Sequence, residues 1–173
     1  MKQIGLFLIL ATVVAGFVMI SCSKDNSGTT LRVRMTDAPV AFDEVNVDID
    51  QVMVKYREET DSTQGWINLD THAGIYDLLG LTNGVDTLLA VGVIPTNVVK
   101  EIRFVLGADN SIVVAGVQYP LSVPSGSESG LKIKVNKQLN GSLDSLLIDF
   151  DAALSIHQTG TGEYQLRPVL KIK

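Results

Sequence analysis

The chain contains one cysteine, one tryptophan and two histidines among its 173 residues, and basic residues are fewer than acidic ones. A single cysteine cannot form an internal disulfide, so core packing has to stabilise the fold that the chain adopts. The 14 Lys and Arg residues against 19 Asp and Glu residues give a formal charge of −5. Nucleic-acid binding and docking on anionic lipid both need clustered positive charge, so this composition argues against both.

Sequence signatures of catalysis are also missing. His72 and His157 are far apart in the sequence and lie beside turn-like segments, so we interpret each as a solvated loop residue. Residues 126–130 resemble a serine nucleophile elbow, but Glu128 stands where the serine belongs. Phosphate-binding loops and dinucleotide fingerprints are absent, and we expect no cofactor. The sequence therefore predicts a protein that is not an enzyme.

The N-terminal 22 residues carry the clearest signal in the sequence. Lys2 is followed by an apolar run over residues 4–20, and then by Ser21 and the only cysteine, Cys22. A basic start, an apolar stretch and a small residue before the cut are typical of a secretory signal. The run also lies at the lower limit for spanning a bilayer, roughly 17–25 residues, so an uncleaved membrane helix is the alternative.

The end of this signal resembles a bacterial lipobox, in which an aliphatic and a small residue precede a cysteine that receives lipid. Met19, Ile20, Ser21 and Cys22 occupy its positions, with Met19 in place of the usual leucine. Several acyl chains on one cysteine give stable membrane anchoring, where a single chain gives only marginal binding. We expect residues 1–21 to be a lipoprotein signal peptide, Cys22 to be lipidated, and residues 22–29 to form a flexible tether.

The tether and the charge of the mature chain predict where the protein is located. Lys24 and Asp25 resemble a surface-export signal of Bacteroidetes-type lipoproteins, and a plain solvated linker is the alternative. Removing Lys2 with the signal leaves 14 − 1 = 13 basic residues against 19 acidic ones, a formal charge of −6. We expect an outer-membrane lipoprotein of the cell envelope, facing either the periplasm or the cell surface.

Residues 30–173 consist of short segments in which apolar and polar residues alternate, separated by turn residues. Alternation of period two indicates strands with one buried face. It is clearest at residues 31–35, 45–56, 102–106, 131–135 and 146–150. The apolar phase shifts within 45–56, which predicts a β-bulge at Asp50 and Gln51. Residues 85–91 are the expected place for a helical turn.

Many short strands with turn signals between them predict a single all-β domain. We expect an antiparallel β-sandwich over residues 30–173, with a Greek-key or a transthyretin- or immunoglobulin-like arrangement. No stretch of the mature chain has a sustained helical period, so helices should be limited to short turns.

Several segments together resemble one bacterial family, the domain of unknown function 4382. They are residues 31–39 (LRVRMTDAP), 78–84 (LLGLTNG), 117–126 (VQYPLSVPSG), 129–132 (SGLK), 147–151 (LIDFD) and 166–170 (LRPVL). They follow the family's order over nearly the whole mature chain. The resemblance implies an exported, often lipid-anchored protein, and it implies no particular chemistry.

Carboxylates are the only candidate metal ligands. Calcium prefers oxygen ligands, so Asp37, Asp149 and Asp151 are candidate calcium residues if they converge. The sequence lacks a twelve-residue calcium loop, and we therefore expect these three acids to serve the fold instead. We expect Asp37 to form an Asx turn, and Asp149 and Asp151 to point away from the core and meet loop backbone or a basic residue such as Arg167. The pair Asp48 and Asp50 is interpreted as a solvated strand face.

Three short tripeptides resemble acceptor sites for O-glycosylation of exported Bacteroidetes-type proteins. The one at residues 144–146 is set aside because it sits at a strand start, which leaves those at residues 61–63 and 86–88. They place candidate glycosylation sites at Ser62 and Thr87, and ordinary turn residues are the alternative. Trp66 is interpreted as a core residue, with a sugar-stacking platform as the alternative.

Two classes of function are compatible with these observations. The first is a non-catalytic binding or adhesion module that is held to the membrane by its lipid and binds a protein or glycan through loops. The second is a periplasmic accessory factor or small hydrolase whose site the sequence does not reveal. A concave pocket with converging polar groups would favour the second class.

Overall fold

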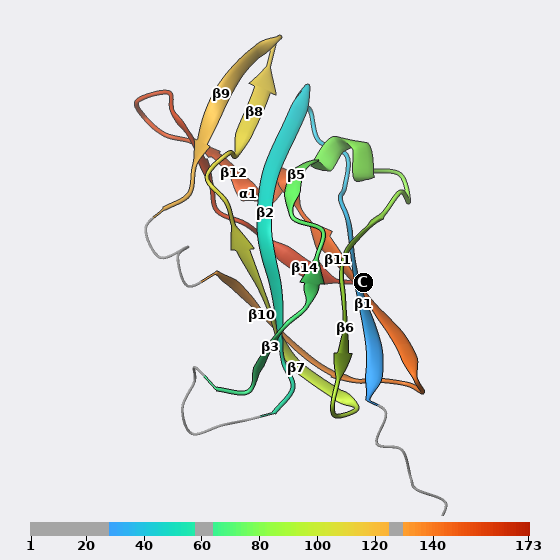
Figure 1. Cartoon of the computed structure of the whole chain (residues 1–173). Helices are drawn as coiled ribbons and strands as arrows, with labels where there is room; N and C mark the ends of the chain where they lie inside the picture. Colours follow the sequence, from blue (N-terminus) through green and yellow to red (C-terminus); the bar gives the residue numbers. More distant parts are fainter. Residues whose placement is uncertain (1–27, 58–63, 125–129) are drawn as a thin grey trace, which may run out of the picture.

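The computed structural model describes residues 28–57, 64–124 and 130–173, which form two sheets stacked face to face around one core (Figure 1). The smaller sheet has five strands in the order β14-β11-β1-β6-β4. Their bounds are β1 Thr29–Thr36, β4 Asp70–Thr71, β6 Thr87–Ile94, β11 Leu143–Phe150 and β14 Leu170–Ile172.

The larger sheet has nine strands, with the long strand β2 (Glu44–Lys55) at its centre. Strands β7, β8, β9, β10, β12 and β13 extend the sheet from one edge of β2, in the order β10-β7-β2-β8-β9-β13-β12, while β3 and β5 pair with its other edge. Their bounds are β3 Trp66–Asn68, β5 Gly74–Asp77, β7 Val98–Leu106, β8 Ser111–Val114, β9 Val117–Ser122, β10 Leu131–Gln138, β12 Ile156–Gln158 and β13 Tyr164–Leu166.

This architecture confirms the predicted all-β sandwich. Most strand pairs in it are antiparallel, but β1 pairs with β11 in parallel over seven residues, and β9 pairs with β13 in parallel. A parallel pair requires a crossover, because two strands that run the same way cannot be joined by a tight hairpin. The crossover between β1 and β11 includes most of the larger sheet.

Alternating side chains from both sheets form the core. From β1, Leu31, Val33 and Met35 are fully buried, and Phe104 of β7 and Phe150 of β11 are the bulkiest side chains packed there. Burying such an aliphatic or aromatic side chain contributes about 1.5–3 kcal/mol to folding. Because the described chain has no disulfide to rely on, this core carries the stability of the sandwich.

The predicted bulge in β2 is confirmed. Pairing with β7 shifts register between Ile49 and Gln51, so that Asp50 has no partner residue on that strand. The extra residue lets Ile49 on one side and Val52 on the other both point into the core, where both are fully buried.

The predicted helical turn at residues 85–91 is wrong, because most of this segment belongs to strand β6. A turn of 3₁₀ helix lies earlier, at η2 (Leu78–Leu81), where the Asp77 carboxylate caps it by accepting a 3.1 Å hydrogen bond from the Leu79 N–H. The other helix is the single turn α1 (Ala152–Ser155). Within the described residues, neither helix has the length and apolar character needed to cross a bilayer.

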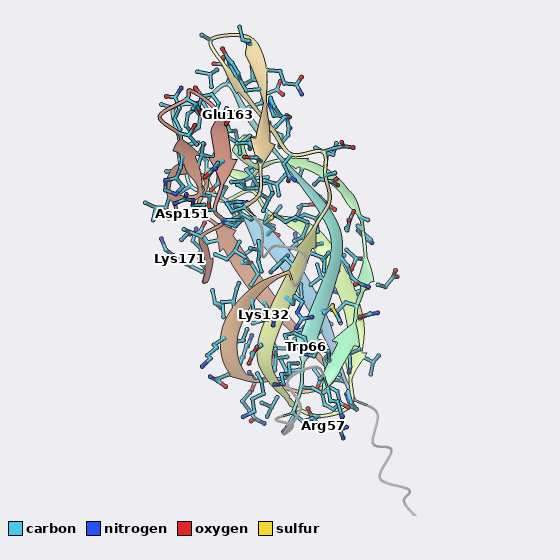
Figure 2. The ribbon with its side chains drawn as sticks, turned by 90° about the vertical axis from the view of Figure 1, so that its left-hand side faces the viewer. Arg57, Trp66, Lys132, Asp151, Glu163 and Lys171 are labelled. Atoms are coloured by element: carbon cyan, nitrogen blue, oxygen red, sulfur yellow. The ribbon has the colours of Figure 1, made fainter. Side chains whose placement is uncertain are left out.

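The two ends of the sandwich carry different features. Strand β1 begins at the lower end in Figure 1, close to the 140–142 turn, since the Thr30 N–H donates to the Ser142 carbonyl at 2.8 Å. The β8–β9 hairpin projects at the opposite, upper end, and Figure 2 shows the same separation after a quarter turn.

Candidate functional site

A cleft of about 710 Å³ lies on the outer face of the larger sheet, towards the end that carries the β8–β9 hairpin. Three carboxamides line it, from Asn46, Asn110 and Gln118, together with the Ser111 hydroxyl and the Asp109 carboxylate. Its apolar surface comes from Ile75, Ala108 and Pro120.

Strand register explains how these side chains come together. Asn46 of β2 is paired with Ser111 of β8, and Ser111 is paired in turn with Pro120 of β9. Paired residues share one face of a sheet, so all three point outwards. Ile75 of β5 is paired with Asp48 on the other edge of β2 and is 56% exposed, which makes it an unusually accessible aliphatic side chain.

The cleft lies where one edge of β2 stops pairing with β7 and begins to pair with β8. Residues 107–110 leave the ladder there, and the Asn110 side chain replaces the missing backbone groups. Its Oδ1 accepts from the Asp48 N–H at 2.9 Å, and its Nδ2 donates to the Gly107 carbonyl at 2.8 Å. Asn110 is only 4% exposed, so both bonds are made in a largely dehydrated place.

Asp48 holds the same loop from the other side. Its carboxylate Oδ2 accepts a 3.1 Å hydrogen bond from the Asp109 N–H, and its carbonyl accepts one from the Gly107 N–H at 3.0 Å. A Cβ atom at Gly107 would overlap this carboxylate, so a larger residue at that position would have to displace the Asp48 side chain. The interpretation of Asp48 as part of a plain solvated face therefore missed its role in shaping the loop.

The lining of the cleft offers hydrogen-bonding amide and hydroxyl groups and one carboxylate. Among the lining residues the only ionisable side chain is Asp109, and neither a nucleophile–base pair nor a cation is present. Amide and hydroxyl groups both donate and accept hydrogen bonds, so they match uncharged ligands rich in hydroxyl or amide groups. An anionic ligand would meet the Asp109 carboxylate without any compensating positive charge.

The three acids proposed as calcium candidates lie near one another at the ends of β1 and β11. Asp37 is only 3% exposed, and its Oδ1 accepts a 3.0 Å hydrogen bond from the Ala152 N–H at the start of α1. Burial raises the pKa of Asp37, and the nearby carboxylates of Asp149 and Asp151 raise it further, against the opposing effect of the hydrogen bonds from the Ala152 and Ala38 backbone.

The other two acids form ion pairs with Lys171 of β14 and with Lys173, which follows that strand. Lys171 Nζ lies 2.6 Å from Asp151 Oδ2, and this hydrogen bond is the main reason that the pKa of Asp151 is lowered. Asp151 also caps α1, since its Oδ1 accepts from the Leu154 N–H at 3.1 Å. Lys173 Nζ lies 3.2 Å from Asp149 Oδ1.

These contacts agree with a structural role for the three acids, but the basic partner differs from the expected one. The Arg167 guanidinium donates to the Gln165 side chain instead of meeting either aspartate. Lys171 and Lys173 take that place because β14 is paired with β11 and brings them alongside. Within the described ranges, no group of three or more His, Cys, Asp or Glu side chains is placed to hold a metal ion.

The remaining candidate residues are scattered. His72 and His157 are both exposed, and His157 lies in strand β12 instead of a loop. Trp66 is half-buried, and the Arg103 guanidinium stacks on its ring at 4.2 Å from the centroid, so that face is not open to a sugar. Thr87 is the first residue of β6 and is partly buried.

Three other predicted positions lie outside the described residues. They are the lipidation candidate Cys22, the glycosylation candidate Ser62 and Glu128 of the elbow-like segment.

Fold and cleft together define an all-β sandwich protein whose outer sheet face carries an open cleft lined by amide, hydroxyl and aliphatic groups. The family model for the domain of unknown function DUF4382 matches residues 28–168, and the chain belongs to this family. The match confirms the resemblance that the sequence motifs indicated. Neither the curated proteins nor the solved structures contain a significant match to the chain.

Proposed function

We propose that this protein is a lipid-anchored, non-catalytic binding module of the cell envelope, and that the cleft at Asn110 is its ligand site. The observation that carries the proposal is the position of the cleft. It lies towards the end of the sandwich opposite the start of β1, so a lipid at Cys22 would leave the cleft facing away from the membrane (Figure 1).

The anchor rests on the sequence. Cys22 follows an apolar run and a small residue, and a polar segment separates it from β1. We place the protein in the outer membrane, facing the periplasm or the cell surface.

The ligand class follows from the lining. Amides, a hydroxyl and exposed aliphatic surface suit an uncharged glycan or a polar protein loop better than a nucleic acid, which an acidic chain would repel. Hydrolysis of a glycosidic bond generally uses two carboxylic acids, whereas Asp109 is the only one in the lining, which supports binding over catalysis.

Fatty-acid labelling tests the anchor. Cells that express the wild-type chain and are fed an alkyne-tagged palmitate should label the protein, and the Cys22→Ala variant should stay unlabelled. Equal labelling of the two would contradict lipidation. Protease treatment of intact cells then separates surface from periplasmic placement.

Screening with a panel of neutral and anionic oligosaccharides tests the cleft. Saturation-transfer NMR on the purified protein should detect a neutral member of the panel, and the double variant Asp109→Ala/Gln118→Ala should abolish the signal. The matched control is Asp70→Ala/Gln138→Ala, which removes the same two side-chain types from exposed positions outside the cleft. Loss of the signal in both double variants, or in neither, would contradict the assignment of the cleft.

A further inference from the structure

One side of the sandwich is left open between its two sheets. Strand β10 ends the path of the larger sheet, and β14 ends the smaller one. In the part of the chain that the structure describes, each of them has a single partner strand, β7 for β10 and β11 for β14. An edge strand presents unpaired backbone N–H and C=O groups, which are a template for another strand.

A groove of about 320 Å³ runs beside this open edge. Leu131 and Ile133 of β10 form one wall, and residues 168–170 form the other with the side chains of Pro168, Val169 and Leu170. Its walls are therefore apolar, apart from Lys132, whose position in the strand lies between Leu131 and Ile133. Aliphatic side chains of an added strand would be removed from water here.

The first half of β10 has the regular geometry that strand addition needs. Residues 131–134 pair with β7 without interruption, and the register shifts only between Lys134 and Lys137, where Asn136 has a φ of 48°. Exposure alternates along the strand, with Leu131 and Ile133 half-buried and Lys132 and Lys134 exposed. A bulge protects the second half of the edge, and the first half is left straight.

Charge selects the partner for this edge. Neither Lys132 nor Lys134 forms an ion pair within the described residues, although Lys134 is opposite Glu101 of β7 in the strand register. The lysines of the neighbouring β14 side differ, because Lys171 and Lys173 are paired with Asp151 and Asp149. Figure 2 shows Lys132 and Lys171 on this side of the molecule, with Lys171 beside Asp151.

Two copies of this chain are poorly suited to pair through the same edge. An antiparallel β10–β10 contact would bring the unpaired lysines of both copies together, and like charges across neighbouring strands destabilise a sheet. An acidic partner strand would instead place negative charges beside these lysines, and opposite charges on neighbouring strands stabilise a sheet.

We propose that the edge of β10 over residues 131–134 is a docking site for an extended acidic segment of a partner protein. The segment adds a strand to the larger sheet. Its apolar side chains share the face of Leu131 and Ile133 and enter the groove, and its carboxylates share the face of Lys132 and Lys134. This site is separate from the cleft, so it does not depend on the function proposed above.

Designed peptides test the proposal on the purified full-length protein. The probe is a fluorescein-labelled octapeptide of alternating glutamate and valine, and fluorescence anisotropy measures its binding. Three comparison peptides carry lysine for glutamate, the same residues in blocks, or N-methyl groups on alternate amides. We expect the first peptide to bind about tenfold more tightly than each of the others, because they lose the charge match, the alternation or the backbone hydrogen bonds.

A charge reversal identifies the site. The double variant Lys132→Glu/Lys134→Glu should bind the glutamate peptide more weakly than the wild type does, and the lysine peptide more tightly. Arg32→Glu/Lys100→Glu makes the same change in net charge outside the groove and should leave both affinities within about twofold. Equal binding of the oppositely charged peptides to the wild type, or equal effects of the two double variants, would overturn the proposal.

Hydrogen exchange on the wild type keeps the test independent of any variant. Saturation with the glutamate peptide should slow amide exchange at residues 131–134, where the added strand forms its bonds. No binding by any peptide, or protection confined to other segments, would also overturn the proposal.

Discussion

Asn110 is expected to be the most sensitive polar residue of the cleft. Replacing it by alanine removes both side-chain bonds that bridge the gap between β7 and β8. The Asp48 N–H and the Gly107 carbonyl then lose their partners in a place where Asn110 itself is almost fully buried.

The cost can be worked from these two contacts. A buried donor or acceptor left without a partner costs about 1–3 kcal/mol. Water entering from the open cleft satisfies part of this demand, so we expect Asn110→Ala to lower the free energy of unfolding by about 2–4 kcal/mol. For a domain of this size, 1 kcal/mol shifts the melting temperature by about 2–4 °C, so a decrease of roughly 5–15 °C should follow.

Asn110→Asp adds a pH dependence with a defined sign. The introduced carboxyl still accepts from the Asp48 N–H, but when ionised it faces the Gly107 carbonyl and lies near the carboxylates of Asp48 and Asp109. Burial and these neighbours raise its pKa in the folded state. The variant should therefore be closest to wild type below the unfolded-state pKa and lose stability as the pH rises through the folded-state pKa.

Urea denaturation followed by circular dichroism at several pH values measures both effects. Asn68→Ala, at an exposed position of β3, is the matched control and should change stability by less than about 0.5 kcal/mol. An Asn110→Ala variant as stable as the control, or an Asn110→Asp variant whose deficit grows in acid, would refute the assigned role of the two hydrogen bonds.

Three further predictions concern single residues. Gly107→Ala should destabilise the protein and weaken ligand binding in the cleft, because its Cβ displaces the Asp48 carboxylate; an unchanged melting temperature would contradict this. Asp151→Ala should lower the free energy of unfolding by about 0.5–2 kcal/mol at neutral pH, because the α1 cap is lost. Since the pKa of Asp151 is lowered in the folded protein, the difference from wild type in urea titrations should fade as the pH drops through that pKa. Asp37→Asn keeps an acceptor for the Ala152 N–H and removes a buried charge, so it should stabilise the protein at pH 7. Below the ordinary aspartate pKa the gain in stability should be small, because Asp37 is then protonated in both the folded and the unfolded state. A loss of stability at pH 7 would show that the Asp37 charge is needed.

The strands were predictable because their side chains alternate strongly. The bulge in β2 followed from one observation, since Ile49 and Val52 cannot both reach the core without an extra residue between them. The helical turn at 85–91 was misassigned because the apolar residues there carry no clear period, and pairing of β6 with β1 on one side and β4 on the other decides the outcome.

The cleft was not predictable from local patterns. It depends on Asn46, Ile75 and Asn110, which lie on three separate segments and meet only through strand pairing. The signal that could have indicated it is the run Gly107-Ala108-Asp109-Asn110, which reads as a strand-ending turn but gives no sign that Asn110 is buried. The lysine partners of Asp149 and Asp151 were missed for the same reason, because the β11–β14 pairing places them.

The parallel pairing of β1 with β11 has a consequence for the order of folding. The Asp37–Ala152 hydrogen bond at the end of this pair joins residues 115 positions apart, and contacts of such long range form late because the loop entropy must be overcome first. A chain that becomes available from its N-terminus onwards cannot complete its smaller sheet until β11 and β14, close to its C-terminus, have been added. Until β11 is available, β1 has only β6 beside it in the smaller sheet, so the edge of β1 that β11 will occupy stays open for most of folding.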